Sequence, residues 1–148
     1  MLDLGIYGLH LAGLFAKCPD PKKSGRTLRD CKSVVVSGEW GVDVSDFILL
    51  EYSDGFVADV CCSIGFFGVN EACVFGETGS IRIAQPFNAA ESCELFASPS
   101  EKFSGPSGFE FEVAHTMECI RGGKTQSDLL PMSDTIAAME IIDKIRGN

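Results

Sequence analysis

The spacing of hydrophobic and polar residues changes several times along the chain, and each spacing predicts a different element. Residues 2–17 are apolar on most sides of a helix, which indicates a helix buried on more than one face. Cys18-Pro19-Asp20-Pro21 ends this helix, and the basic, polar segment 22–30 follows as a loop. From there the period becomes two, which predicts strands over 31–40, 45–53 and 56–66.

The last two of these strands are predicted to form a hairpin. Asp54-Gly55 lies between them, and this dipeptide favours a type I′ turn, in which both central residues have positive φ. Alternation along 56–66 places one set of side chains on the core face: Phe56, Ala58, Val60, Cys62, Ile64 and Phe66. The side chains on the other face are small and of mixed polarity, so this sheet is expected to have one buried side.

Further elements follow in the second half. Residues 69–87 read as a hairpin that turns at 77–79, 92–98 as a strand, and the Ser-, Gly- and Pro-rich 98–108 as a loop. Helices are predicted over 109–123 and from Ser133, the expected N-cap, to the end. This order predicts one α+β domain over residues 1–148, an open, mostly antiparallel sheet with helices on one face.

Composition narrows the function classes. A formal net charge of −9 disfavours nucleic acid and anionic membranes as partners. No apolar run approaches the roughly 20 residues of a membrane span. Asp3 and His10 interrupt the first apolar segment, which also lacks a basic start, so we do not expect a signal peptide. The 7 cysteines form no C-x-x-C pair and favour reduced thiols in a cytoplasmic protein over disulfides or zinc.

Several catalytic motifs are absent. The chain has no G-x-S-x-G nucleophile elbow and no G-x-G-x-x-G dinucleotide fingerprint. Residues 76–80, GETGS, lack the lysine and the length of a phosphate loop and fit a hairpin turn better. The only histidines, His10 and His115, lie far apart without a ligand cluster, so no metal site is expected. A small metal or redox protein built on the cysteines is the weakest alternative.

Asp3, Tyr7 and His10 are the chemically suggestive residues of the first predicted helix. Their spacing, i, i+4 and i+7, places them on roughly one helical face. Packing, with Asp3 as an N-cap or first-turn anion, explains that spacing. So does proton transfer, in which a tyrosine or histidine beside a carboxylate moves the hydroxyl proton of an alcohol while hydride leaves the same carbon.

Four stretches, in order and spacing, resemble the glucose–fructose oxidoreductase and inositol dehydrogenase family (Gfo/Idh/MocA). LDLGIYGLHLA is similar to its Asp-x-Gly-x-Tyr/His segment, and VFGETGSIRIAQPF to its G-T-x-G hairpin. FEFEVAHTMECIRGG is similar to its E-x-x-H helix, and SDLLPMSDTIAAMEIIDKIR to its closing helix. Tyrosine four residues after the aspartate is similar to the dimeric dihydrodiol dehydrogenases and related NADP-dependent sugar dehydrogenases.

The resemblance implies the C-terminal domain, like that of glyceraldehyde-3-phosphate dehydrogenase, of an NAD- or NADP-dependent enzyme that acts on a sugar, polyol or dihydrodiol. By the same resemblance, Tyr7 is the proton donor or acceptor, Asp3 positions or polarises it, His10 supports substrate binding, and Phe87 lines the pocket. For Phe87, a place in the core is an equal alternative. The resemblance also implies a homo-oligomer, with a dimer through the sheet as the expected form.

The chain departs from the family pattern because the dinucleotide fingerprint and the family's Glu-Lys-Pro motif are absent. We therefore expect a fragment or truncated product that lacks the dinucleotide-binding domain, binds no cofactor alone and is inactive alone. A second hypothesis is a stand-alone oligomerisation or interaction module. It rests on DFILLEY, residues 46–52, which is apolar on both faces, so that helices can cover only one of them.

Overall fold

The computed structural model describes residues 2–18 and 26–147, which form two compact units. The first unit comprises residues up to 67 and from 128 onward, and the second comprises residues 68–127. The prediction of one domain over the whole chain stays a prediction.

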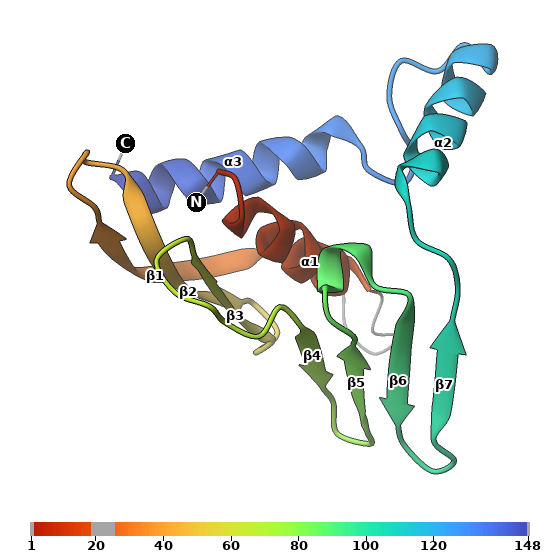
Figure 1. The fold of residues 1–148 in the computed structure, drawn as a ribbon, viewed down its shortest axis with the longest axis horizontal. Coiled ribbons are helices and arrows are strands. Elements are labelled where there is room, and N and C mark those ends of the chain that lie inside the picture. The colour runs from red at the N-terminus through yellow and green to blue at the C-terminus, as the bar shows by residue number, and fades with distance from the viewer. Residues whose placement is uncertain (1, 19–25, 148) are drawn as a thin grey trace. The chain divides into compact units, whose positions relative to one another are not determined.

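The first unit is a three-stranded antiparallel sheet with two helices on one face (Figure 1). Its strands β1 (Leu28–Ser37), β2 (Asp43–Tyr52) and β3 (Val57–Ser63) pair in sequence order. Helix α1 (Gly5–Lys17) packs on β3, helix α3 (Met132–Arg146) packs on β1, and the two helices contact each other. Leu50 and Ile142 are fully buried at the centre of this core.

The second unit contains an antiparallel meander of four strands. Strands β4 (Ala72–Phe75), β5 (Ser80–Ile83), β6 (Ser92–Phe96) and β7 (Glu101–Ser104) pair in sequence order. The short 3-10 helix η1 (Phe87–Ala89) lies between β5 and β6, and α2 (Phe109–Arg121) follows β7. The predicted turn at 77–79 is confirmed, because the Gly76 N–H donates to the Gly79 carbonyl at 2.8 Å.

The predicted helix over residues 2–17 begins later than expected. Its N-cap is Leu4, which has no side-chain hydrogen bond to the helix, and the first turn holds no acidic residue. Asp3 therefore precedes α1 in a turn and does not cap it. The same correction applies to α3, whose N-cap is Pro131, since Ser133 lies inside the first turn.

The hairpin between β2 and β3 is confirmed, but its turn type was wrong. Gly55 has φ +86°, whereas none of the described non-glycine residues, Asp54 included, has positive φ. The Gly55 N–H donates to the Tyr52 carbonyl at 3.1 Å, and the Tyr52 N–H to the Phe56 carbonyl at 2.9 Å. This pattern is that of a three-residue loop, a type I turn followed by a left-handed glycine, which also suits the strand twist.

The core face of β3 is confirmed only as far as the strand extends. Phe56, Ala58 and Val60 pack against the core, but Ile64 and Phe66 are exposed beyond the strand end. The Ser63 hydroxyl accepts the Gly65 N–H at 2.9 Å, and this local turn ends the strand.

Strand β7 was predicted to be loop. Within residues 98–108, Glu101–Ser104 pairs with β6, and Lys102 forms an ion pair with Glu94 across the strands at 3.3 Å. Pairing of this kind overrides a weak local preference for coil. Within the described residues the strands form two sheets, where a single open sheet was expected.

A glycine allows α1 to approach the sheet closely. A Cβ added at Gly8 would lie 2.5 Å from Val60 Cγ1, whereas one added at Gly13 meets nothing within 4 Å. The missing side chain at Gly8 therefore sets the distance between α1 and β3.

We expect Gly8→Ala and Gly13→Ala to change stability in opposite directions. Gly8→Ala overpacks against a stiff β-branched side chain and lowers the free energy of unfolding by roughly 1–3 kcal/mol. Gly13→Ala raises it by about 0.5–1 kcal/mol, because alanine restricts the unfolded chain and favours helix. Urea unfolding followed by circular dichroism measures both; equal effects would contradict the close approach at Gly8.

Candidate functional site

Helix α1 presents Tyr7 on its accessible side. The buried residues of the helix are Gly5, Leu9, Ala12 and Ala16, which share one side at 100° per residue. Tyr7 lies on the opposite side and is 49% exposed. Its phenol is thus held on a rigid helix and is open to a reactant, which a proton-transfer group requires.

Asp3 lies in the turn before α1 and lines a cavity of about 310 Å³. This cavity, at the end of the three-stranded sheet, is also lined by Asp43, Asp46, Cys62 and Arg146. Among the described residues, Asp3 and Tyr7 form no hydrogen bond with each other. The expected line of three polar groups on one helix is therefore reduced to Tyr7 and His10, since Asp3 lies outside the helix.

His10 lines a different cavity, a groove of about 400 Å³ between α1 and α3. Its floor is apolar, with Leu9, Ala138 and Ile141 among its residues. Lys17 and Asp134 form an ion pair at the rim. Lys17, by hydrogen bond and by charge, lowers the pKa of the Asp134 carboxyl, and His10 adds a smaller effect in the same direction. The structure thus brings His10 toward Asp134, and among the described lining residues Tyr7 is in neither cavity.

Phe87 belongs to the second unit. It is the first residue of η1, it is half-buried, and its N–H donates to the Asn70 carbonyl at 2.9 Å. Its predicted place in a substrate pocket with residues of the first unit stays a prediction.

A buried carboxylate beside a thiol was missed by the sequence reasoning. Asp46 is 1% exposed on the core face of β2, and Cys62 Sγ donates to its Oδ2 at 3.6 Å. Burial, and then the Asp46 charge, raise the pKa of the Cys62 thiol to about 11. The signal was present in the sequence, because Asp46 occupies the same alternating face as Ile48, Leu50 and Tyr52.

A second cluster lies in the second unit. His115 Nε2 is 2.8 Å from Ser127 Oγ and 3.5 Å from Cys119 Sγ. In the part of the chain that the structure describes, no three His, Cys, Asp or Glu side chains are placed to hold a metal ion.

No described helix has both the length and the apolar character needed to cross a membrane.

Comparison with known proteins confirms the resemblance seen in the sequence. No family model matches the chain. Human trans-1,2-dihydrobenzene-1,2-diol dehydrogenase is 26% identical over 156 residues, and the mouse protein of that name is 27% identical over 155. Each alignment covers 99% of this chain, but the chain spans only 45% of the human relative and 44% of the mouse relative. The chain is thus homologous to less than half of these dehydrogenases.

Solved structures confirm the α+β fold with open antiparallel sheets. The 3-ketoreductase KijD10 from Actinomadura kijaniata, in complex with NADP and TDP-benzene, has a TM-score of 0.73 at 18% identity, over 99% of this chain and 44% of that chain. The aldose-aldose oxidoreductase of Caulobacter crescentus, complexed with glycerol, has a TM-score of 0.76 at 18% identity, over 97% and 43%. These proteins share the fold of the C-terminal domain of Gfo/Idh/MocA enzymes.

We expect the adjacent thiols of Cys61 and Cys62 to differ sharply in reactivity. Cys61 is exposed on the outer face of β3, while Cys62 is partly buried with a pKa of about 11. Because the thiolate is the nucleophile, iodoacetamide at pH 8 should label Cys61 first, and Cys62 should react only as the pH approaches 11.

The raised pKa also sets the sign of the stability effect. The Cys62 thiol contributes stability below the ordinary thiol pKa, and this contribution falls as the pH rises toward 11. Mass spectrometry of the peptides after brief labelling measures the reactivity. Equal labelling of both thiols at pH 8 in folded protein would contradict the buried position of Cys62.

Proposed function

We propose, from its homology to the trans-1,2-dihydrobenzene-1,2-diol dehydrogenases, that this chain is the C-terminal, substrate-side part of an NAD- or NADP-dependent oxidoreductase. The reaction is hydride transfer between the nicotinamide and a secondary alcohol of a sugar, polyol or dihydrodiol. The dinucleotide-binding domain lies outside residues 1–148 in this proposal, because these residues contain no G-x-G-x-x-G fingerprint. A cytoplasmic location is part of the proposal.

The observation that carries the proposal is the placement of Tyr7. Tyr7 is carried by α1, which packs closely on the sheet at Gly8, and the Tyr7 ring lies on the accessible side of this helix. A bound dinucleotide would supply the nicotinamide that accepts hydride from the substrate carbon. In that oxidation direction Tyr7, as the phenolate, would accept the proton of the substrate hydroxyl at Oη. In the reverse direction it returns that proton to the carbonyl oxygen.

The other proposed site residues have auxiliary roles. Asp3, in the turn before α1, positions or polarises Tyr7. His10, at the mouth of the groove between α1 and α3, supports the substrate. Phe87 supplies an apolar contact in the pocket. None of these three is proposed to receive hydride or to form a covalent bond.

An alternative function, a β-sheet interaction module without catalysis, is favoured by one observation. The outer face of the three-stranded sheet carries Val34, Phe47, Leu49 and Val57, which are 44–63% exposed. An exposed apolar patch on a sheet is typical of an interface. Under either function, we propose that this face pairs with a second copy of the chain.

If the cofactor site lies outside these residues, the isolated chain should not bind NADPH. Titration of the 148-residue chain, followed by NADPH fluorescence, should show no saturable change at micromolar concentrations. Saturable micromolar binding would contradict the proposed division of the enzyme.

Tyr7→Phe tests the proton-transfer role in a fusion that places the dinucleotide-binding domain of the human relative before residue 2. We expect kcat for NADP-dependent oxidation of trans-1,2-dihydrobenzene-1,2-diol to fall roughly 10²–10⁴-fold. Tyr52→Phe is the matched control, since it removes the same hydroxyl from the chain's other tyrosine, which is buried in the core. Equal loss in both variants, or no loss in Tyr7→Phe, would contradict the role of Tyr7.

A further inference from the structure

Helix α2 carries a histidine and a cysteine one turn apart. His115 and Cys119 have the spacing i, i+4, which places both side chains on one face of the helix. His115 Nε2 lies 3.5 Å from Cys119 Sγ. Cys119 is buried and His115 is half-buried, so the imidazole and the thiol meet away from bulk solvent.

The end of α2 brings a third polar group to the same nitrogen. Gly123 has φ +69°, a left-handed conformation that glycine adopts without strain and that commonly ends a helix. The chain turns back there, and the Lys124 N–H donates to the Cys119 carbonyl at 2.9 Å. Ser127 Oγ then lies 2.8 Å from His115 Nε2. All of these residues belong to the second unit.

The nitrogen His115 Nε2 has two partners but can make only one full hydrogen bond with them. In a neutral imidazole this atom carries either a lone pair or a proton. As an acceptor it takes the Ser127 hydroxyl proton or the Cys119 thiol proton, but not both. As a donor it favours the hydroxyl oxygen, because a thiol sulfur is a weak acceptor. A cation placed among the three groups would bind all of them at once.

The spacing of sulfur and nitrogen suits such a cation. A tetrahedral Zn²⁺ ion, with Zn–S of about 2.3 Å and Zn–N of about 2.0–2.1 Å, holds the two atoms roughly 3.5 Å apart. The separation of Cys119 Sγ and His115 Nε2 is 3.5 Å. The Ser127 oxygen, now at hydrogen-bond distance, would have to withdraw by roughly 0.5 Å to occupy a third position of the tetrahedron.

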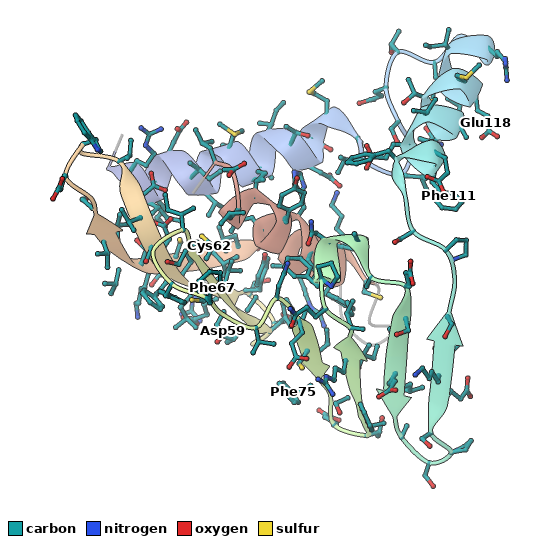
Figure 2. The ribbon with its side chains drawn as sticks, in the orientation of Figure 1. Asp59, Cys62, Phe67, Phe75, Phe111 and Glu118 are labelled. Carbon is teal, nitrogen blue, oxygen red and sulfur yellow. The ribbon has the colours of Figure 1, made fainter. Side chains whose placement is uncertain are left out.

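The charges of α2 also favour a cation. Cys119 lies in the last turn of the helix, where the carbonyl end of the helix dipole attracts positive charge. The helix carries three glutamates, Glu110, Glu112 and Glu118, and a single arginine, Arg121. Figure 2 shows Glu118 pointing outward from α2, where its carboxylate adds to the negative potential without taking part in the cluster.

We propose that His115, Cys119 and Ser127 form a binding site for a divalent cation that prefers sulfur and nitrogen ligands, with Zn²⁺ as the expected ion. On binding, the cation replaces the thiol proton of Cys119, which passes to solvent. The proposal goes beyond the proposed function and is independent of hydride transfer.

The site is open at its fourth position. Within the described residues no third His, Cys, Asp or Glu joins the pair, so water completes the tetrahedron around the ion. Zn²⁺ should therefore bind more weakly than in a closed structural site with four protein ligands. A bound ion would link the segment after α2 to the helix through Ser127.

Titration of the full chain with Co²⁺, a spectroscopic substitute for Zn²⁺, tests the site. We expect a thiolate-to-cobalt charge-transfer band in the near ultraviolet, which added Zn²⁺ abolishes. His115→Gln and Cys119→Ser should each weaken Co²⁺ binding at least about tenfold, since loss of residues that merely orient metal ligands already costs roughly 10–100-fold. Ser127→Ala should weaken binding by a smaller factor.

Cys73→Ser is the matched control, because it removes an exposed thiol from β4 of the same unit and should leave the titration unchanged. Circular dichroism verifies the fold of each variant. The wild type gives a second test that needs no substitution: the chain has 2 histidines, and Zn²⁺ should shift the ring signals of His115 in nuclear magnetic resonance spectra but not those of His10.

Two results would overturn the site. One is the absence of a cobalt–thiolate band together with unshifted His115 signals, which would leave the cluster as hydrogen-bonded packing. The other is a band of unchanged affinity in both His115→Gln and Cys119→Ser, which would place the cation on other thiols. Unchanged affinity in Ser127→Ala would overturn the role of Ser127 alone. None of these outcomes bears on the NADPH or Tyr7 experiments.

Discussion

The first unit depends on one constraint: α1 and α3 form a single layer that covers one face of a three-stranded sheet. The hydrophobic core lies on the covered face, where Leu50 and Ile142 are fully buried. Strand β2 is the centre of the sheet because it pairs with a strand on each side. Such a layer has only two surfaces left, the outer side of the helices and the outer face of the sheet. The proposed chemistry uses the first and the proposed pairing uses the second.

Arg26 connects the end of the helix to the sheet. Its guanidinium donates to the Phe15 carbonyl at 2.8 Å and to Asp54 at 2.5 Å, and it lies 4.7 Å from the centroid of the Phe56 ring. The arginine therefore satisfies a carbonyl in the last turn of α1 and neutralises a carboxylate of the β2–β3 hairpin at once. Both side chains are largely shielded from water, so loss of either partner would leave the other charge buried and unpaired. With the close contact at Gly8, the Arg26 contacts fix the helix that carries Tyr7.

Local pattern predicted much of this fold, and long-range contacts explain what it missed. The alternation of apolar and polar residues identified the covered face of β2 and β3, and Asp54-Gly55 identified the hairpin. The type of its turn depends on the pairing register of the two strands, which the dipeptide alone does not determine. Spacing alone placed Asp3 on the helix, because i, i+4 and i+7 describe an uninterrupted helix and contain no information on where it begins. Residues 101–104 lack a strong strand signal and become β7 only through their pairing with β6. At the candidate site, sequence spacing placed Asp3 and His10 on one helical face, whereas in the structure the two residues line separate cavities.

The two proposed activities do not compete for surface. Tyr7 lies on the side of α1 opposite its buried residues, and those residues face the sheet and α3. The exposed apolar residues Val34, Phe47, Leu49 and Val57 lie on the far face of the same sheet. Two copies that pair through their sheets would thus leave both phenols pointing outward, each free to meet a substrate and a dinucleotide-binding domain. One layer of helices on one sheet is sufficient to separate proton transfer from assembly.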